Sequence, residues 1–471
     1  MPRKKIKNPV TLFYPNKLSV RDLRLEVVNY YQSGNHSGNY KGNTKERDYY
    51  LFFHMLVEPY LCLHPVDSKY IQIHSDIIQD VFGRDYPKVI SALVKHAYIL
   101  VDDYSSEYLG ICKSYAVHPR LMDETQPLLT VDIEYDTVLN NKLDRIGNVN
   151  LTKVSDTLSQ EMLDEGRQHV KAMTSQLILV PSKEALAYVQ AQYEAEGNPN
   201  PPHAYFHHFN YNPMRGGCID KFGKRMHSLI TKMPKVIRAC LRFKSAPDMP
   251  TKEGDFVNSQ PYFLSVINSA LIALFAPECY SAIPVYERYR GEDDFVEFAQ
   301  LCSTGKIYEE FIRLYRETYN ESYGSDDDEA RNITKTLIYS AFFSDYEQTE
   351  KGLGAKSSRT DFSQVKKNFF QLFKTEFESV YLLFAELKSL YWSFTVNSKG
   401  ERKQYANNCL LAQRVESGIM YERVIPNLLA HGITDVVTVH DCIIVKECDI
   451  IAAKAVMTDT FSQLNLSPKI K

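Results

Sequence analysis

The stretch VVTVHDCIIV, residues 436–445, is an apolar, β-prone run with a His-Asp pair at its centre. Valine and isoleucine occupy most of its positions, as is typical of a buried strand. His440 and Asp441 are the exceptions that need an explanation. Because a carboxylate in apolar surroundings is costly unless it is paired or holds a metal ion, Asp441 predicts a functional partner elsewhere in the chain.

Asp255 is the best candidate for that partner. It lies in EGDFVNSQPYFLSVINSALIALF, residues 253–275, where a strand could end and an apolar helix begin. Two carboxylates from adjacent strand ends can hold two divalent ions, which clamp the attacking and leaving oxygens of a phosphoryl displacement. Asp255 and Asp441 therefore form a candidate metal site for two Mg²⁺ ions.

A third segment, SDDDEARNITKTLIYSAFF from residue 325 to residue 343, could bind the phosphates of a nucleotide. Ser325 and the aspartates after it predict the capped N-terminus of a helix. Arg331, Lys335 and Tyr339 follow at intervals of four, which puts them on one helix face. Two cations and an aromatic ring in line fit a triphosphate followed by a sugar or base. Taken alone, such a segment is more often a solvated basic face.

Together these segments resemble the family A nucleic-acid polymerases, meaning the DNA polymerase I group and the related phage-type single-subunit RNA polymerases. DFVNSQP (255–261) resembles motif A, RNITKTLIY (331–339) motif B and TVHDCIIV (438–445) motif C. GKRMHSLITKMPKVIRACLRF (223–243) resembles the segment that leads into motif A. The order of the four segments matches the family, and the resemblance spans residues 220–447, although only short motifs match.

The resemblance implies roles for the residues of motifs A to C. Asp255 and Asp441 would hold the two Mg²⁺ ions. Lys335 and Arg331 would bind the phosphates, and Lys335 would protonate the leaving pyrophosphate. Tyr339 would stack near the incoming sugar and base.

The same resemblance implies contacts with the nucleic acid. Arg225 and Arg238 would lie near the template-primer duplex, and His440 would lie close to the primer end. Gln260 is a polar residue on the nucleotide side of motif A. Extra residues before it prevent its alignment with the sugar-discriminating position of the family.

The sequence departs from the family pattern at two further positions. DNA polymerase I members usually have Glu after the His-Asp pair, but this chain has Cys442, and the RNA polymerases also have a small residue there. Motif B normally ends in Tyr-Gly, four residues beyond the aromatic, whereas this chain has Phe343 and Ser344. These departures leave the core chemistry intact and leave the choice of sugar open.

The expected fold is α+β: a right-hand polymerase with palm, fingers and thumb, preceded by an accessory module. Residues 1–125 would form the accessory module, residues 126–213 a helical thumb-like region and linker, and residues 214–471 the palm and fingers. In the module, SDIIQDVFG reads as a helix capped by Ser75, and YPKVISALVKHAYIL reads as a helix with Pro87 in its first turn.

A hairpin in YILVDDYSSEYLGICKSYAVH follows these two helices, and the order helix, helix, hairpin resembles a winged helix. The module would then touch DNA or RNA. A small packing domain is an equally good interpretation.

Composition narrows the class of protein. The net charge of −3 excludes a uniformly basic nucleic-acid coat, while basic clusters such as PRKKIK, DKFGKRMHSLITKMPKVIR and KSSR could still line a groove that attracts phosphates. Nine cysteines without a CxxC pair argue against zinc or a disulfide framework. Neither a signal peptide nor a membrane span is expected, so we expect a cytoplasmic protein, from a phage, plasmid or mobile element.

The sequence thus predicts a template-directed DNA polymerase without a proofreading domain, acting on a DNA template-primer and nucleoside triphosphates. Two alternatives stay open. One is an RNA polymerase or primase of the same architecture, with RNA as a partner. The other is a degenerate palm that only binds nucleic acid.

Overall fold

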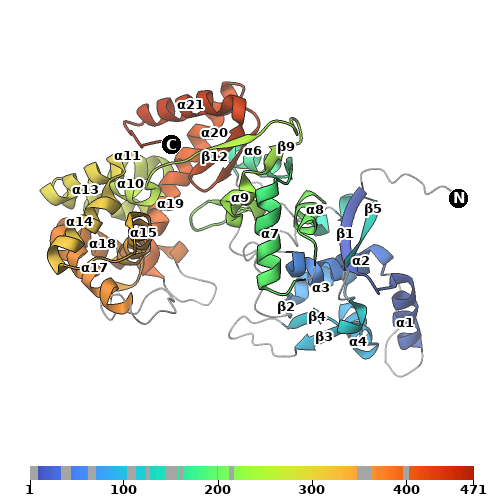
Figure 1. Ribbon diagram of the computed structural model, residues 1–471. Coiled ribbons are helices and arrows are strands. Elements are labelled where there is room, and N and C mark those ends of the chain that lie inside the picture. The colour runs from blue at the N-terminus through green and yellow to red at the C-terminus, as the bar shows by residue number, and fades with distance from the viewer. Residues whose placement is uncertain are drawn as a thin grey trace. The chain divides into compact units, whose positions relative to one another are not determined.

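The structure is a computed structural model, and Figure 1 shows its elements. It describes residues 9–32, 44–61, 70–102, 113–122, 128–134, 136–139, 141–143, 158, 163–198, 200–211, 217–346, 362–395 and 403–471. The predicted basic clusters PRKKIK and KSSR lie outside the described residues. The chain divides into two compact units, which we take in turn: unit 1 comprises residues 1–151, 175–217 and 228–250, and unit 2 comprises residues 152–174, 218–227 and 251–471.

Unit 1 contains the predicted pair of helices and the hairpin. α3 (Ser75–Phe82) and α4 (Tyr86–Lys95) are followed by β3 (Ile99–Asp102) and β4 (Ser114–Val117), which pair antiparallel. β2 (Ile71–Gln72) joins the sheet, whose strand order is β2-β4-β3. Helix, helix and hairpin are therefore confirmed.

One detail of these helices differs from the prediction. The N-cap of α3 is His74, whose ring accepts a hydrogen bond from the backbone of Asp76, so the assignment of the cap to Ser75 is wrong. α4 does carry Pro87 at its N-terminus. Its Val89, Ala92 and Leu93 face the core, whereas Val94 is 43% exposed.

The first helices and strands of unit 1 enclose the same core. α2 (Glu46–Val57) is buried along most of its length because aromatic and aliphatic residues occupy nearly every position after Asp48. α1 (Val20–Gln32) packs against α2 and α4. β1 (Pro9–Pro15) pairs along its full length with β5 (Leu128–Glu134), so unit 1 continues past the predicted boundary at residue 125.

The region predicted as one helical segment, residues 126–213, is shared between the two units. Unit 1 receives β6 (Leu177–Leu179), α7 (Lys183–Ala195) and α8 (His203–Tyr211), and unit 2 receives α6 (Glu165–Thr174). In unit 1, β6 pairs with β9 (Leu241–Phe243), which follows a 3₁₀ turn and α9 (Lys235–Arg238). The pairing of β6 with the distant β9 thus places residues 177–211 in unit 1, separate from α6.

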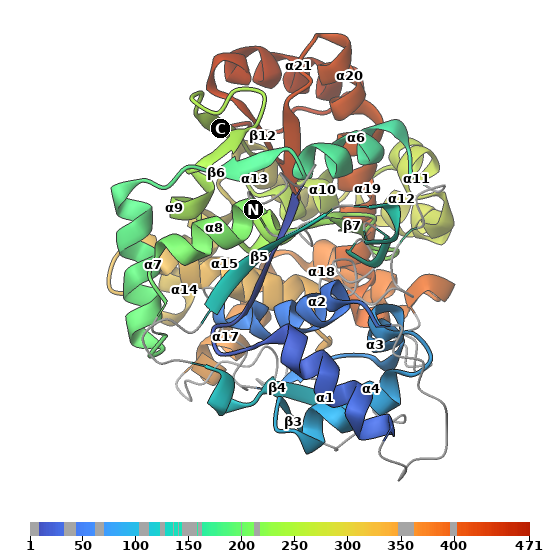
Figure 2. The ribbon, with the colours of Figure 1, turned by 90° about the vertical axis from the view of Figure 1, so that its right-hand side faces the viewer.

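Unit 2 is built on a three-stranded antiparallel sheet with strand order β10-β12-β11. β11 (Val436–Val439) and β12 (Cys442–Lys446) come from the stretch VVTVHDCIIV, and β10 (Thr251–Gly254) comes from the segment that contains Asp255. Figure 1 and Figure 2 both place α20 (Ile425–Ala430) and α21 (Ile450–Ser462) beside β12.

A helical part of unit 2 lies between β10 and β11 in the sequence. It packs through aromatic rings: Phe298, Phe342, Phe373 and Phe384 contact one another at centroid distances of 5.1–6.3 Å. Such rings bury a large apolar area and pack in tilted or edge-on pairs. The helices are α10 (Ser259–Val266), α11 (Ser269–Phe275), α12 (Ile283–Tyr289), α13 (Asp293–Thr304), α14 (Ile307–Tyr319), α15 (Asp327–Phe343), α17 (Phe362–Glu376) and α18 (Glu378–Ser389).

A bent helix connects this helical part to the sheet. α19 (Asn407–Ile419) continues through a π-helical turn, Met420–Val424, into α20. Tyr421 in the π turn shares a hydrogen bond with Thr438 of β11 over 2.8 Å, and its hydroxyl accepts one from the backbone of Met226 over 3.3 Å. π turns are frequent at functional sites, and this one fixes β11 to its neighbours.

None of the helices in the described part of the chain combines the length and the apolar character needed to cross a bilayer.

The contact between α6 and the π turn gives a first prediction. A Cβ at Gly166 would lie 1.9 Å from the carbonyl oxygen of Tyr421. Gly166→Ala should therefore force the two helices apart and lower the free energy of unfolding by about 1–3 kcal/mol. Urea denaturation followed by circular dichroism measures the change. Gly291→Ala is the control, because a Cβ there meets nothing within 4 Å. Equal midpoints for the two variants would contradict the close packing.

Candidate functional site

The His-Asp pair forms the turn of the β11–β12 hairpin. Val439 pairs with Cys442, so His440 and Asp441 are the two residues of the connection. His440 has φ +56°, in the left-handed region that non-glycine residues seldom adopt. Two-residue hairpin connections need such a conformation, so the turn explains why polar residues interrupt the apolar run. It also brings Asp441 to the end of the sheet.

Asp255 lies at the same end of the sheet. It directly follows Gly254, which pairs with Ile443 of β12, two residues beyond Asp441. Its backbone also pairs with Lys471, whose ammonium is 3.0 Å from the Asp255 carboxylate. The two aspartates, distant in sequence, are thus brought together by the pairing of β10 with β12.

Asp441 experiences excess negative charge. Burial, together with the negative charges of Glu416 and Asp255, raises the pKa of its carboxyl to about 7 against the opposing charge of Arg225. Three carboxylates thus face one guanidinium. A divalent cation would neutralise this excess.

Glu416, on α19, is the residue of this site that the sequence did not single out. It is 1% exposed, and both of its oxygens accept hydrogen bonds. Oε1 accepts from Arg225 over 2.5 Å, and Oε2 accepts from Ser259 over 2.7 Å and from Gln260 over 2.8 Å. A buried carboxylate needs such compensation. Glu416 therefore fixes two predicted site residues in place.

The contacts of Glu416 define the places of Arg225 and Gln260, whereas Arg238 belongs to unit 1. The Arg225 side chain is 12% exposed and Gln260 is 6% exposed, so both lie inside unit 2, next to the carboxylates. Burial lowers the pKa of Arg225, but the charges of Glu416 and its other acidic neighbours, with the hydrogen bond to Glu416, together outweigh burial and raise the pKa, which keeps the guanidinium cationic. Arg238 lies at the end of α9 in unit 1, where it donates to the carbonyl of Met233 over 3.5 Å.

The predicted cation–aromatic face is present on α15. Arg331 and Lys335 both lie over the ring of Tyr308 on α14, at 4.8 Å and 5.9 Å from its centroid. Arg331 also forms an ion pair of 2.8 Å with Glu309. The aromatic platform holds the two cations side by side on one helix face, as the spacing of four predicted.

Tyr339 is the member of this face that lies nearest the carboxylates. Desolvation and the negative charges of Asp441 and Glu416 raise the pKa of its hydroxyl to about 12. The line from Arg331 to Tyr339 therefore runs toward the carboxylates. The predicted N-terminal cap of α15 is present: among Ser325 and the aspartates after it, the N-cap is Asp326, which accepts from the backbone of Glu329.

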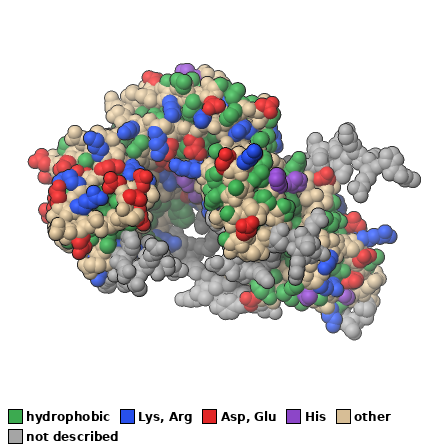
Figure 3. All heavy atoms as spheres, viewed as in Figure 1, with side chains coloured by type: hydrophobic (Ala, Val, Ile, Leu, Met, Phe, Trp, Pro, Cys, Tyr) green, Lys and Arg blue, Asp and Glu red, His purple; other side chains and the backbone are tan. Residues whose placement is uncertain are grey.

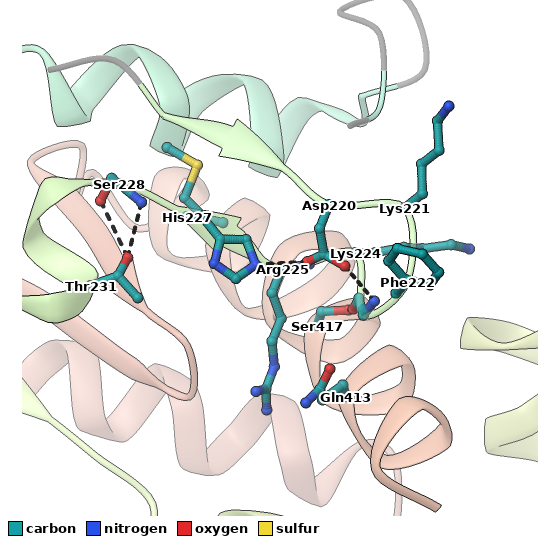
Figure 4. Close-up of polar contacts among 12 residues, drawn as sticks. Asp220, Lys221, Phe222, Lys224, Arg225, His227, Ser228, Thr231, Gln413 and Ser417 are labelled. Carbon is teal, nitrogen blue, oxygen red and sulfur yellow. Dashed lines mark hydrogen bonds and ion pairs between the residues drawn. The ribbon is translucent and has the colours of Figure 1, made fainter. Parts of the chain in front are cut away.

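A second hairpin carries Arg225 in its turn. β7 (Cys218–Ile219) and β8 (Met226–His227) flank a turn in which Asp220 accepts three hydrogen bonds (Figure 4). The donors are the backbone of Gly223 at 2.6 Å, the backbone of Arg225 at 3.0 Å and Nε2 of His227 at 2.9 Å. The turn is therefore closed on one buried carboxylate.

α19 binds the backbone of this turn. Arg414 donates to the carbonyls of Phe222 and Lys221 over 2.5 Å and 2.8 Å, and Ser417 donates to that of Gly223 over 2.7 Å. A Cβ on Gly223 would lie 2.5 Å from the Gln413 side chain, so glycine permits the close approach. One helix thus positions both the turn that carries Arg225 and the carboxylate that Arg225 binds.

Asp255 and Asp441 fit the chemistry of Mg²⁺, which prefers carboxylate oxygens and usually keeps water and phosphate ligands besides one or two carboxylates. In the described residues, no group of three or more His, Cys, Asp or Glu residues has the arrangement of a protein-only metal site. An ion held here would therefore share its coordination with water and substrate oxygens.

The exposed charges of the helical part are mixed in sign. Figure 3 shows acidic and basic side chains interspersed over the face that carries α13 to α15. Many of them form ion pairs, such as Arg313 with Glu317 and Arg316 with Asp327. Exposed pairs of this kind contribute little to stability.

No protein-family model matches the chain, and no curated protein matches it at a significant level.

The buried carboxylate of Asp441 gives a prediction that needs no activity. Its pKa of about 7 lies above the ordinary 3.8, so the folded protein binds the extra proton between these values. This extra proton stabilises the folded protein fully below about pH 4. As the pH rises to about 7 the stabilisation is lost, which lowers the free energy of unfolding by about 4 kcal/mol. Asp441→Asn should remove this term, so the variant gains stability relative to the parent as the pH rises.

Urea denaturation in the presence of a chelator, at intervals between pH 4 and pH 8, measures this difference. Asp328→Asn is the control, because Asp328 is an exposed aspartate in the first turn of α15. Parallel stability curves for the parent and Asp441→Asn would contradict the burial of a charged carboxylate.

Proposed function

We propose that the protein is a template-directed DNA polymerase that transfers nucleotides to a 3′-hydroxyl by two-metal catalysis. The observation that carries the proposal is the convergence of Asp255 and Asp441 at one end of the β10-β12-β11 sheet. Nothing local forces together two carboxylates so far apart in sequence. A paired-carboxylate site at adjacent strand ends suits phosphoryl transfer.

The aspartates of the site would bind the metal ions, and the cations of α15 would bind the nucleotide. Two Mg²⁺ ions held by Asp255 and Asp441 would supply charge that stabilises the attacking and leaving oxygens. Arg331 and Lys335, held over Tyr308, would bind the triphosphate of the incoming nucleotide. Positioning and charge stabilisation account for most of the catalysis of such reactions, so little covalent chemistry is asked of the protein.

The nucleotide's sugar and base would lie toward Tyr339, because this residue is the end of the α15 face nearest the carboxylates. Gln260 is bonded to Glu416, so its amide is held in a single orientation beside the site. A fixed polar group at this place supports discrimination between sugars that differ in one hydroxyl.

An accessory role in binding the duplex is proposed for the helices and hairpin of unit 1. α2, β2, α3, α4, β3 and β4 follow one another with the sheet order β2-β4-β3, and this order supports the winged-helix interpretation. If the module binds DNA, its removal should reduce the salt dependence of DNA binding. If it is only a packing domain, its removal should leave that salt dependence unchanged.

An RNA polymerase or primase is the second candidate function, and Cys442 is the observation that favours it, because the RNA polymerases resemble this chain in having a small residue there. A primer-extension assay with deoxynucleotides and ribonucleotides in parallel separates the two. Extension with deoxynucleotides supports the first candidate, extension with ribonucleotides alone supports the second, and binding without either supports a degenerate palm.

The metal pair gives the most direct prediction from this proposal. Asp255→Asn and Asp441→Asn keep the size of each side chain and remove the charge that would hold Mg²⁺. Each should abolish primer extension while the protein still folds and binds template-primer. The two losses should not add in the double variant, because the loss of either ligand already dismantles the site. Extension that survives in either single variant would exclude the two-aspartate mechanism.

The cation face of α15 gives a separate prediction. Lys335→Ala should slow single-turnover incorporation by about 10²–10³-fold, because a cation that neutralises developing charge acts chiefly in the transition state. Lys374→Ala is the matched control: Lys374, on α17, also lies over a tyrosine ring, at 5.0 Å from the Tyr381 centroid. Equal rates for the two variants would indicate that the α15 face is a solvated basic surface without a role in nucleotide binding.

A further inference from the structure

His227 is a residue near the carboxylate site to which the sequence gave no role. Its Nε2 lies 2.9 Å from the carboxylate of Asp220, and its side chain is 34% exposed. The other ring nitrogen, Nδ1, has no bonding partner among the described residues. The imidazole is therefore fixed at one end and available at the other (Figure 4).

The ionisation state of Asp220 determines which ring nitrogen of His227 carries the proton. Burial opposes its ionisation, but hydrogen bonds from His227 and from the backbone of Gly223 and Arg225 prevail and hold its pKa below the ordinary value. Asp220 is thus an anion that accepts from Nε2–H. The neutral imidazole must then present a lone pair at Nδ1. This is how a carboxylate sets the tautomer of a histidine that acts on a hydroxyl.

The fold places this imidazole beside the His-Asp turn. The hydroxyl of Tyr421 bonds both the backbone of Met226 and the side chain of Thr438, which fixes β8 next to β11. His227 directly follows Met226, and His440 lies two positions after Thr438. Their rings are accordingly 6.0 Å apart and edge-on, and Asp441 is the next residue.

We propose that His227, oriented by Asp220, is a substrate-binding residue of this site: its Nδ1 accepts the hydrogen bond of the terminal hydroxyl of the nucleic-acid strand that is extended. The inference rests on the proposed function and names the group that the strand end meets. The hydrogen bond directs an oxygen lone pair of the hydroxyl toward the incoming phosphate. Asp220 acts through His227 and is a positioning residue.

The proposal is tested by binding, without chemistry. Two template-primers are compared by fluorescence anisotropy in Mg²⁺ without nucleotide: one primer ends in a 3′-hydroxyl, and the other ends in a 2′,3′-dideoxynucleotide. The parent protein should bind the hydroxyl end about 5–10-fold more tightly, the value of one hydrogen bond. His227→Gln, which keeps a donor for Asp220, should bind the two ends equally. His431→Gln, an exposed histidine at the end of α20, should keep the parent's preference.

Asp220→Asn provides the second variant. It should weaken the preference for the hydroxyl end through the loss of orientation, and the double variant should behave as His227→Gln alone, because the two residues act as a unit. Single-turnover extension should show a lower rate in His227→Gln at unchanged nucleotide affinity.

The inference is overturned if the parent protein binds both ends equally, if it binds neither, or if the preference survives in His227→Gln and Asp220→Asn. The proposed function fails by a different result: extension that persists in Asp255→Asn or Asp441→Asn, or no extension with any nucleotide. The two failures are therefore distinguishable.

Discussion

The candidate site depends on the buried carboxylate of Glu416. An isolated carboxylate at 1% exposure would be strongly destabilising. Arg225, Ser259 and Gln260 compensate it, and they come from two different parts of unit 2: the β7–β8 turn supplies the guanidinium, and the start of α10 supplies the hydroxyl and the amide. Removal of one partner would leave a buried charge without its full set of donors, which is why such networks hold their members in one arrangement.

α19 extends the effect of this carboxylate through the unit. The same helix holds the β7–β8 turn through Arg414 and Ser417, and its π-helical continuation holds β11 through Tyr421. α19 and its continuation thus hold the sheet, the β7–β8 turn and the start of α10 in place. A site that must bring separate carboxylates together needs this kind of rigid support, because a shift of one ångström would separate the ligands of a shared ion.

Local sequence signals predicted the parts of the site that local chemistry determines. Residues spaced by four on a helix have to share a face, so the α15 face follows from the pattern. The β-prone run VVTVHDCIIV predicted a buried strand, and the structure divides it into two strands at His440 and Asp441. The partners of Glu416 depend on which distant segments meet, and no spacing encodes that. The available signal was a charged residue within the small and apolar run VESGI, residues 415–419. The pairing of β1 with β5 moved the first unit's boundary for the same reason.

Iron-directed cleavage of the protein backbone tests most directly whether Asp255 and Asp441 share a divalent ion. Fe²⁺ replaces Mg²⁺ at oxygen-rich sites, and with ascorbate and peroxide it generates radicals that cut the chain close to the bound ion. Mass spectrometry of the fragments locates the cuts. The account predicts cuts near both residue 255 and residue 441, suppressed by excess Mg²⁺ and absent in Asp441→Asn. Cuts at only one of these positions, or cuts that excess Mg²⁺ does not suppress, would contradict a shared metal site.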